Sequence, residues 1–405
     1  MNEVIRTHGL DVGYDGKTVI GGVEINALQG QTICLIGPNG AGKSTILRTL
    51  AGMLAPVGGV VYIGRDDIRS LKPNDLAKQM AVVLTERLNV NMTSAYEVVS
   101  MGRIPYTGFF GRLNADDHLV VRECMKIVGA TDLAEREFLS LSDGEKQKIL
   151  IARALAQEPR LIILDEPTTH LDIKHKIEVV RILNRLSAAN GVTVVLALHD
   201  VDIAVKNCQF VMLIKNGGIV AHGRPEDVIE KDTICELYDI EGAVFNSVMG
   251  SLEICNDKDP QAFVISGAGS GAPVFRLLSR MGYGVATGIL HKNDIDWLIA
   301  ESMKLTVISE QSFEPVSEAN RAAAETCMRK AAFVVDTGFP VGAYNRDNIG
   351  LLRFAAGIKP VFSMRSPEET GRLYGGKLNV INVSSAGQLQ ERIAGLDVSG
   401  HARDY

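Results

Sequence analysis

The chain has 405 residues, which is more than one ordinary hydrophobic core holds, so we expect two domains. A hydrophobic fraction of 46% and a charged fraction of 22% are typical of a globular protein and exclude a disordered chain. The formal net charge of −6 argues against a general nucleic-acid binder. The six cysteines form no Cys-x-x-Cys pair, which excludes a close-spaced zinc knuckle and indicates a reducing compartment.

The sequence contains no segment of the kind that targets or inserts a chain. Its N-terminus lacks the apolar core of a signal peptide, and no apolar run approaches the ~20 residues that span a bilayer. We therefore expect a soluble protein, for which any membrane role comes through a partner.

The first residues read as antiparallel strands. Apolar and polar residues alternate over 3–30, on both sides of a turn at 15–17. Tyr14 lies just before that turn. Its ring is either an ordinary strand aromatic or a surface that stacks on a purine base, and the pattern leaves both open.

A glycine-rich loop at Gly37–Thr45 is the feature around which the first half of the sequence is organised. It follows an apolar strand at 33–36 and precedes a helix at 46–50, which is the context that a phosphate-binding loop requires. The glycines let backbone N–H groups point at phosphate oxygens, and the helix N-terminus adds its positive dipole end. We expect Lys43 to reach the β- and γ-phosphates and Ser44 to ligate Mg²⁺. The alternative is a plain turn between a strand and a helix.

A helical insert is expected after the loop helix. Strands at 60–63 and 80–84 flank a short helix at 71–78, and helices at 96–102 and 116–128 follow with apolar residues at helical spacing. These two helices interrupt the sheet pattern.

The next helix begins at Ser142 and continues through 156. Ser142 and Glu145 have the spacing of a capping box, a purely structural device worth about 1 kcal/mol. A helix N-terminus with an exposed serine and Gly144 is also an anion site, so both interpretations stand.

Two buried strands then end in polar residues. The strand at 161–164 ends in Asp165 and Glu166, a pair that would cost several kcal/mol if buried without partners. Beside a phosphate loop, this pair predicts a Mg²⁺-shell aspartate and a glutamate that acts as general base for water. The strand at 192–198 ends in His199, which is either a neutral structural histidine or a residue at the γ-phosphate.

In this order, the motifs resemble the ATP-binding subunit of an ABC transporter, in particular the import class that serves iron-siderophore, haem and vitamin B12 permeases. The Walker A loop corresponds to Gly37–Thr45, Walker B to Leu161–Asp165, the signature to Leu141–Glu145, the D-loop to Thr169–Asp172 and the switch histidine to His199. The class-specific segment is 98–106, and the resemblance covers about residues 3–250. It implies that Glu166 and His199 are catalytic. The ATP-binding residues that it implies are Tyr14, Gly37, Pro38, Asn39, Gly40, Ala41, Gly42, Lys43, Ser44, Thr45, Ser142 and Gly144.

Two departures from the family pattern concern metal and phosphate contacts. The Q-loop glutamine, a Mg²⁺ ligand in the family, falls at Thr85, so the implied metal ligands are Ser44, Asp165 and Thr85, with Glu86 as a possible substitute. Asp143 and Glu145 bring negative charge to a signature that normally has a glycine and a glutamine there, and the helix dipole offsets about 1 kcal/mol of that repulsion.

The resemblance implies an α/β fold, an ABC-type P-loop ATPase domain with a mixed sheet, an antiparallel edge and a helical insert. It implies a homodimer in which two ATP molecules lie between the loop of one copy and Ser142 and Gly144 of the other. The expected partners are a multi-span membrane permease and an extracytoplasmic substrate-binding protein, with the ATPase at the cytoplasmic face of the membrane and no nucleic acid. We expect ATP hydrolysis coupled to import of a corrinoid (cobalamin), with a ferric siderophore or haem as the alternative cargo. A soluble non-transport ABC ATPase, acting in nucleic-acid repair or translation, and an exporter are the further alternatives.

A second domain is expected at 256–405, after an ATP-binding domain at 1–255 and a linker at 256–260. Alternating strands and helices predict a Rossmann-like α/β domain of unknown ligand. Gly267–Gly271 matches a dinucleotide fingerprint weakly and is equally compatible with a tight turn. Asp294, Asp296 and Asp336 follow its strands and fit solvated loop acids. Our hypothesis is a regulatory or substrate-sensing domain.

Overall fold

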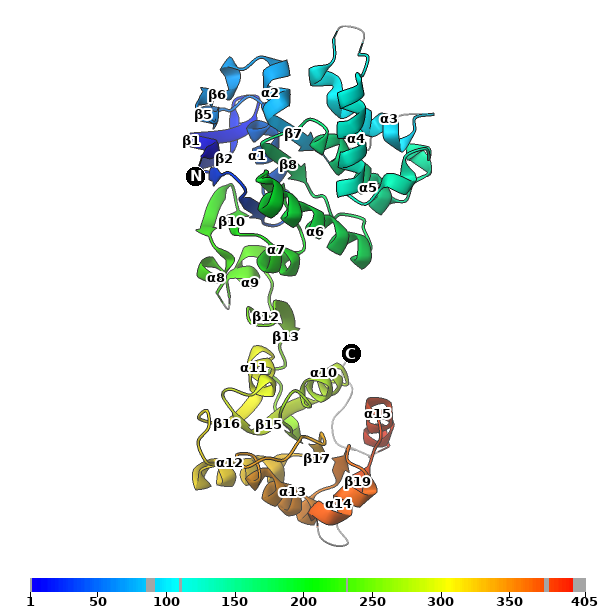
Figure 1. The fold of residues 1–405 in the computed structure, drawn as a ribbon. Coiled ribbons are helices and arrows are strands. Elements are labelled where there is room, and N and C mark those ends of the chain that lie inside the picture. The colour runs from blue at the N-terminus through cyan, green and yellow to red at the C-terminus, as the bar shows by residue number, and fades with distance from the viewer. Residues whose placement is uncertain (1, 85–91, 109–110, 231, 375–378, 396–405) are drawn as a thin grey trace. The chain divides into compact units, whose positions relative to one another are not determined.

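The computed structural model describes residues 2–84, 92–108, 111–230, 232–374 and 379–395. Its contacts divide the chain into two compact units, unit 1 at Met1–Asp239 and unit 2 at Ile240–Tyr405 (Figure 1). The division lies before the expected boundary at 255 because a hairpin packs with the second unit. That hairpin consists of β12 (Ala243–Asn246) and β13 (Ser251–Ile254), and Asn246 Nδ2 donates to Ser302 Oγ at 3.0 Å.

Unit 1 contains an antiparallel sheet in the order β2-β1-β5-β6, with β3 paired to β1. The strands are β1 (Glu3–Tyr14), β2 (Lys17–Val23), β3 (Asn26–Leu28), β5 (Gly58–Ile63) and β6 (Asp66–Asp67). The turn between β1 and β2 takes positive φ at Asp15 and Gly16, as the sequence indicates for a tight hairpin.

A second sheet of unit 1 has the order β11-β10-β4-β9-β8-β7, in which every pair is parallel except β10 with β11. Its strands are β4 (Thr32–Ile36), β7 (Met80–Val83), β8 (Leu161–Asp165), β9 (Thr193–Ala197), β10 (Phe210–Lys215) and β11 (Gly218–Gly223). All residues of β4, β8 and β9 are buried, which explains their continuous apolar runs. Since these strands are parallel, the residues that follow them meet at one edge of the sheet.

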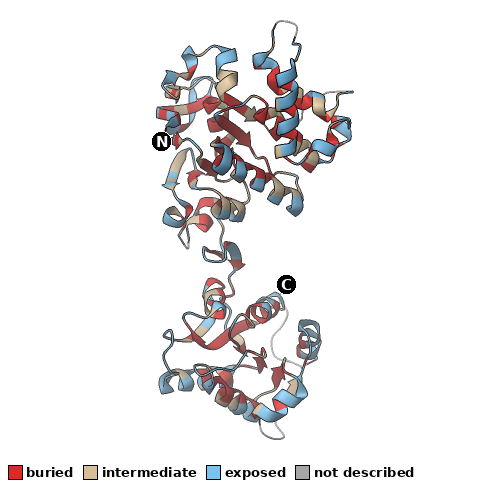
Figure 2. Ribbon diagram, viewed as in Figure 1, coloured by how far each residue is buried: buried red, intermediate tan, exposed pale blue. Residues whose placement is uncertain are grey.

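Helices cover this sheet, and α1 lies in the core that both sheets share. Figure 2 shows the buried strands between partly exposed helices. The helices are α1 (Lys43–Leu50), α2 (Pro73–Gln79), α3 (Ala95–Ser100), α4 (Ala115–Ile127), α5 (Asp143–Leu155), α6 (Ile173–Asn190), α7 (Val201–Asn207), α8 (Pro225–Val228) and α9 (Thr233–Tyr238). Short 3₁₀ helices are η1 (Ile68–Ser70), η2 (Met101–Tyr106), η3 (Thr131–Leu133) and η4 (Phe138–Ser140).

The expected helical insert is present. In Figure 1, α3, α4 and α5 lie together at one side of unit 1, where they pack on one another. Across the described residues, no helix combines the length and the apolar character that crossing a membrane requires.

Unit 2 is built on a parallel sheet in the order β16-β15-β14-β17-β18-β19. Its strands are β14 (Pro260–Ile265), β15 (Gly284–His291), β16 (Thr306–Glu310), β17 (Phe333–Asp336), β18 (Val361–Ser363) and β19 (Val380–Asn382). The chain runs outward from β14 to β16 in one direction and from β17 to β19 in the other. Strand order therefore reverses between β14 and β17, which is where open α/β sheets bind ligands.

Both faces of this sheet are covered. Its helices are α10 (Ala272–Arg280), α11 (Ile295–Ser302), α12 (Glu318–Lys330), α13 (Asp347–Ile358), α14 (Pro367–Tyr374) and α15 (Ala386–Ala394). On β14, Ala262 and Val264 pack with α10, α11 and α15, whereas Phe263 and Ile265 pack with α12 and α13. This alternation follows from the two-residue period of a strand.

Candidate functional site

The glycine loop between β4 and α1 has a conformation that glycine requires. Gly40 and Gly42 take φ of 79° and 99°, which strains other residues. A Cβ on Gly37 would lie 2.2 Å from the carbonyl oxygen of Ile214 on β10. Local backbone geometry and a close approach to the sheet therefore both fix this loop.

Lys43, the first residue of α1, is 4% exposed and lies inside the loop. Its Nζ donates to the carbonyl oxygens of Gly37 at 2.7 Å and Pro38 at 3.0 Å. Burial lowers the pKa of Lys43, and the negative charges of Glu166 and Asp165 oppose that shift. The loop therefore holds an ammonium group next to two carboxylates.

The neighbours of Lys43 connect α1 to β8 and β1. Ser44 Oγ donates to Asp165 Oδ1 at 3.0 Å, so two oxygen ligand types of a hard cation lie side by side. Asp165 ends β8 and is 5% exposed. Thr45 Oγ1 donates to the hydroxyl of Tyr14 at 3.4 Å, and Tyr14, at the end of β1, is 45% exposed.

The residues after β8 and β9 meet as the parallel sheet predicts. His199 Nε2 lies 2.5 Å from Glu166 Oε1, and Thr169 Oγ1 donates to Glu166 Oε2 at 3.2 Å. Glu166 takes φ of 51°, so the chain turns sharply where the carboxylate leaves the strand. The structure thus brings Lys43, Asp165, Glu166 and His199 to one edge of the sheet, and it adds Thr169, which the sequence did not single out for this contact.

The capping box at the start of α5 is confirmed. The Glu145 amide donates to Ser142 Oγ at 3.3 Å, and the Ser142 amide donates to Glu145 Oε2 at 2.8 Å. This backbone hydrogen bond lowers the pKa of Glu145, and Arg136 pairs with it at 3.1 Å. The extra charge of Glu145 is therefore held by partners within its own chain. Among the described residues, no hydrogen bond or ion pair joins Ser142 to the glycine loop.

Gly144 has a packing reason that the sequence did not reveal. A Cβ there would lie 2.2 Å from Cγ of His175 on α6. His175 is held in turn by Asp172, the residue before α6, with Nδ1 to Oδ1 at 2.8 Å. No sequence signal pairs these positions, because the contact arises only from the packing of α5 on α6.

Thr85 and Glu86, the expected Q-loop positions, lie outside the described residues. Within segment 98–106 the structure shows a buried arginine with two acidic partners, one buried and one exposed. Arg103 is 5% exposed and binds Asp117 at 2.9 Å and Glu158 at 2.7 Å. A Cβ on Gly102 would lie 2.2 Å from the carbonyl oxygen of Arg153. Gly102 and Arg103 therefore both hold the helical insert against α5.

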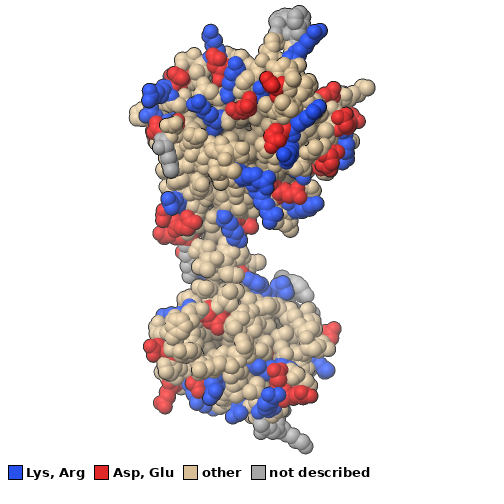
Figure 3. Space-filling model, viewed as in Figure 1, with Lys and Arg blue, Asp and Glu red and all other residues tan. Residues whose placement is uncertain are grey.

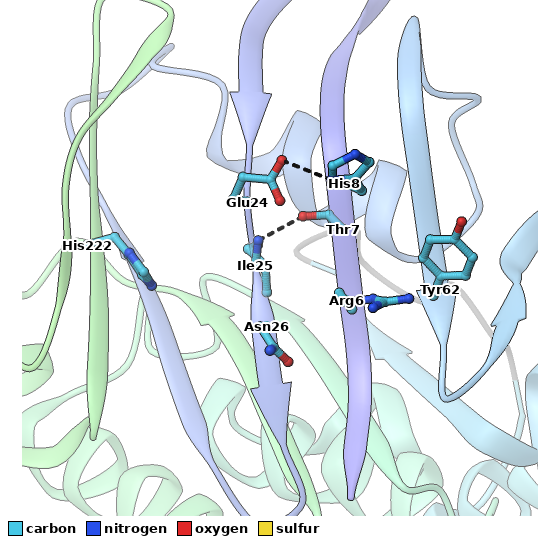
Figure 4. A pocket seen from close by; sticks show the side chains of 8 residues that line it. All are labelled: Arg6, Thr7, His8, Glu24, Ile25, Asn26, Tyr62 and His222. Atoms are coloured by element: carbon cyan, nitrogen blue, oxygen red, sulfur yellow. Dashed lines mark hydrogen bonds and ion pairs between the residues drawn. The ribbon is translucent and has the colours of Figure 1, made fainter.

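A cavity of about 500 Å³ lies over the antiparallel sheet (Figure 4). Arg6 of β1 lies over the ring of Tyr62 of β5 at 4.8 Å, and His8 Nδ1 is 3.9 Å from Glu24 Oε1. None of the expected nucleotide residues lines it.

In unit 2, the interpretation of the acids as solvated is wrong for Asp296 and Asp336, because both are 0% exposed. Asp336 accepts from Arg365 Nε at 2.9 Å and from Tyr374 at 2.8 Å, which makes it the centre of a buried network. The amides of Gly271 and Ala272 donate to Asp296 at 2.9 Å and 3.1 Å.

A strand, a glycine loop with a buried lysine and a neighbouring strand that ends in two carboxylates together define a P-loop nucleotide-binding protein. The family described as ABC transporter matches residues 20–169, and the MJ0874 family matches residues 285–392. The chain belongs to the ATP-binding proteins of ABC transporters: it is an ATPase related to siderophore and cobalamin importers, with an MJ0874-family domain near its C-terminus.

Three relatives carry this assignment. The chain is 46% identical over 289 residues to an uncharacterized ABC transporter ATP-binding protein, MJ0873, of Methanocaldococcus jannaschii, which covers 71% of this chain and 100% of the relative. It is 32% identical over 353 residues to the cobalamin import ATP-binding protein BtuD of Halobacterium salinarum, and the match covers 85% of this chain and 88% of the relative. It is 32% identical over 251 residues to the iron(3+)-hydroxamate import ATP-binding protein FhuC of Bacillus subtilis, and the match covers 62% of this chain and 93% of the relative.

A solved structure supports the fold of unit 1. CbiO1 of Clostridium perfringens, described as part of the ABC transporter complex CbiONQ, superposes with a TM-score of 0.51 at 27% identity. The match covers 58% of this chain and 94% of CbiO1.

Proposed function

We propose that this chain hydrolyses ATP to energise import of a corrinoid, of the cobalamin class, through a separate permease. The observation that supports ATP hydrolysis is a cluster of side chains at one edge of the sheet, which consists of Lys43, Ser44, Asp165, Glu166 and His199. The cobalamin relative supports the cargo. Its match covers 353 residues, more than the 239 of unit 1, so it extends into unit 2.

The glycine loop binds the phosphates in this proposal. Its backbone N–H groups and the start of α1 face the phosphate oxygens, and Lys43 moves from the carbonyls of Gly37 and Pro38 to the β- and γ-phosphates. Tyr14, with its ring partly exposed, stacks on the base. The rest of the loop, at 38–42, wraps the phosphate chain.

The oxygens of Ser44 and Asp165 fit a Mg²⁺ ion, because a hydroxyl and a carboxylate 3.0 Å apart are the hard ligands that the ion prefers. When bound, such an ion neutralises charge on the β- and γ-phosphates. Thr85 is proposed as a further ligand from its sequence position alone.

Glu166 is the proposed general base and accepts a proton from the attacking water. His199, 2.5 Å from Glu166 Oε1, and Thr169, 3.2 Å from Oε2, fix the orientation of the carboxylate. His199 also lies at the edge where the γ-phosphate would sit, so it can bind that group.

A second copy of the chain supplies Ser142 and Gly144 to the γ-phosphate in the proposed homodimer. The test is Glu166→Gln, which blocks hydrolysis and should accumulate an ATP-bound dimer in analytical ultracentrifugation. A variant that binds ATP and stays monomeric contradicts the dimer mechanism.

Transport is tested separately from ATP hydrolysis. We propose a multi-span permease, an extracytoplasmic substrate-binding protein and a location at the cytoplasmic face of the membrane. The relation of CbiO1 to the CbiONQ complex supports such an assembly. Uptake of labelled cobalamin should fall in a deletion strain and return with the wild-type gene. Loss of ferric hydroxamate or haem uptake instead would favour the alternative cargo that FhuC suggests.

The soluble alternative predicts purification without a permease and binding to nucleic acid. Figure 3 shows basic and acidic side chains interspersed over the drawn face of unit 1, where a nucleic-acid binder would present a basic surface. Co-purification with a membrane permease would exclude this alternative.

For residues 256–405 we propose a Rossmann-like domain that senses a ligand. The strand order of unit 2 and the reversal between β14 and β17 support this assignment.

A further inference from the structure

Unit 2 has a cavity of about 560 Å³ at the carboxyl ends of its strands. It is formed by the loops after β14, β15, β16 and β17, which contribute Ala268, Asp294, Phe313 and Tyr344, respectively. This is the edge where strand order reverses, and the volume is that of a small-molecule site.

Three backbone amides at this edge already bind carboxylates of the protein. In a dinucleotide-binding domain, the amides of the glycine loop and of the following helix face the pyrophosphate. Here the Ala268 amide donates to Asp294 Oδ2 at 2.9 Å, and the Gly271 amide donates to Asp296 Oδ2 at 2.9 Å. The protein's own carboxylates therefore stand where phosphates would bind.

The crevice between the two central loops is also closed. Ser270 Oγ lies 2.6 Å from Thr337 Oγ1, which joins the loop after β14 to the loop after β17. A pyrophosphate at this point would have to break this contact and displace two carboxylates.

Three aromatic side chains also line the cavity. Phe313 and Tyr344 are 66% and 55% exposed, and their ring centroids are 6.2 Å apart at 70°. His291 meets Tyr344 at 6.3 Å and 73°. Rings held edge to face leave their outer faces available for a further ring.

The charge of the cavity has one sign. Among the described residues that line it, Asp294 is the one acidic side chain, and no lysine or arginine is present. Asp294 is partly exposed, so its carboxylate acts on a ligand in the cavity as well as on the loop amides.

We infer that this cavity binds a small uncharged or cationic ligand with a planar ring, and that it rejects dinucleotides and other phosphate esters. The ring stacks on Tyr344 and Phe313, while the Asp294 carboxylate attracts a cation or accepts a hydrogen bond. The inference rests on the proposed ligand-sensing role of unit 2 and is independent of the ATPase mechanism of unit 1.

The test uses three fluorescent tricyclic probes that differ in charge, with the full-length protein. These are proflavine (a cation), acridone (neutral) and acridine-9-carboxylate (an anion), with binding followed by fluorescence anisotropy and NAD⁺ added as competitor. Proflavine and acridone should bind, the anion should bind at least about tenfold more weakly than the cation, and NAD⁺ should not displace them.

Variants locate the binding. Tyr344→Ala should raise the Kd of proflavine about tenfold, because it removes a stacking face. Tyr106→Ala is the matched control, since it removes an exposed tyrosine that belongs to neither proposed site and should leave this Kd unchanged. Tyr14→Ala tests whether the probes bind at the proposed adenine position instead. Asp294→Asn keeps an oxygen that can accept from the Ala268 amide. Because it removes the negative charge, it should reduce the difference in affinity between the cationic and the anionic probe.

Four results would overturn the inference: no binding by proflavine and acridone, tighter binding by the anion than by the cation, displacement of the probes by NAD⁺, or a loss of binding in Tyr14→Ala but not in Tyr344→Ala. ATP hydrolysis of the same preparations is measured in parallel. If ATP is hydrolysed and the probes do not bind, only the ligand assignment of unit 2 is refuted. If ATP is not hydrolysed and the probes bind, only the ATPase mechanism of unit 1 is refuted.

Discussion

The contact between Gly144 and His175 makes a quantitative prediction about the signature. In Gly144→Ala, the new methyl carbon would lie 2.2 Å from Cγ and 2.8 Å from Cβ of His175. Ordinary contact begins at 3.4 Å, so the new methyl group and the His175 ring must move apart by about 1.2 Å. Rotation of the ring cannot relieve the clash cheaply, because Cβ is also too close and the ring is bound to Asp172 at 2.8 Å. We expect a local destabilisation of roughly 1–3 kcal/mol.

The same displacement should impair hydrolysis. Ser142 and Gly144 belong to one turn, so a shift at Gly144 moves the proposed γ-phosphate contacts in the dimer. A misplacement of about 1 Å costs roughly 100-fold in rate, and we expect the ATPase rate to fall by that order.

The assay combines ATP hydrolysis with hydrogen exchange of the amides of α5 and α6, which reports local opening. Gly108→Ala is the control, since no atom of the residues that the structure describes lies within 4 Å of a Cβ at that position. Adding His175→Ala to Gly144→Ala removes the ring but not Cβ, so amide protection should recover in part while hydrolysis stays low. Unchanged protection in Gly144→Ala would refute the packing argument, and full recovery of hydrolysis in the double variant would refute a phosphate contact at Gly144.

Three further predictions concern buried charge, pH and the nucleotide loop. Asp336→Asn leaves Arg365, which is 8% exposed, without its buried charged partner, so the free energy of unfolding of unit 2 should fall by about 3–5 kcal/mol. Urea unfolding followed by the fluorescence of Trp297, the single tryptophan, measures this change. A loss below about 1 kcal/mol would contradict the prediction. The hydrogen bond from the Ser142 backbone lowers the pKa of Glu145, so the ionised carboxylate stabilises unit 1 at pH values above its unfolded pKa of about 4.3, and this stabilisation is lost as the pH falls through the lower folded pKa. In Glu145→Gln, the protection of α5 amides against hydrogen exchange should therefore fall less in acid than in the wild type. An identical pH profile of the two proteins would count against this prediction. Lys43→Ala should abolish ATP binding in isothermal titration, and wild-type affinity would remove the phosphate-loop assignment.

Features that depend on neighbours along the chain were predictable from the sequence. The glycine loop requires positive φ at fixed positions, and the capping box joins Ser142 to a residue three positions later. The buried strands β8 and β9 appear as continuous apolar runs, and parallel strands place the residues after them at one edge. The fold class of both halves and the approach of His199 to Glu166 follow from these local rules.

Contacts between helices that are distant in sequence could not be predicted in this way. Nothing in the pattern pairs Gly144 with His175 or shows that Arg103 is buried between Asp117 and Glu158. The loop at Gly267–Gly271 is the clearest case. Its sequence is the same whether its amides face a phosphate or a carboxylate, because composition fixes the turn and not its partner. Only the tertiary structure, which carries Asp294 and Asp296 back from the end of the next strand, decides that the protein itself occupies the anion position.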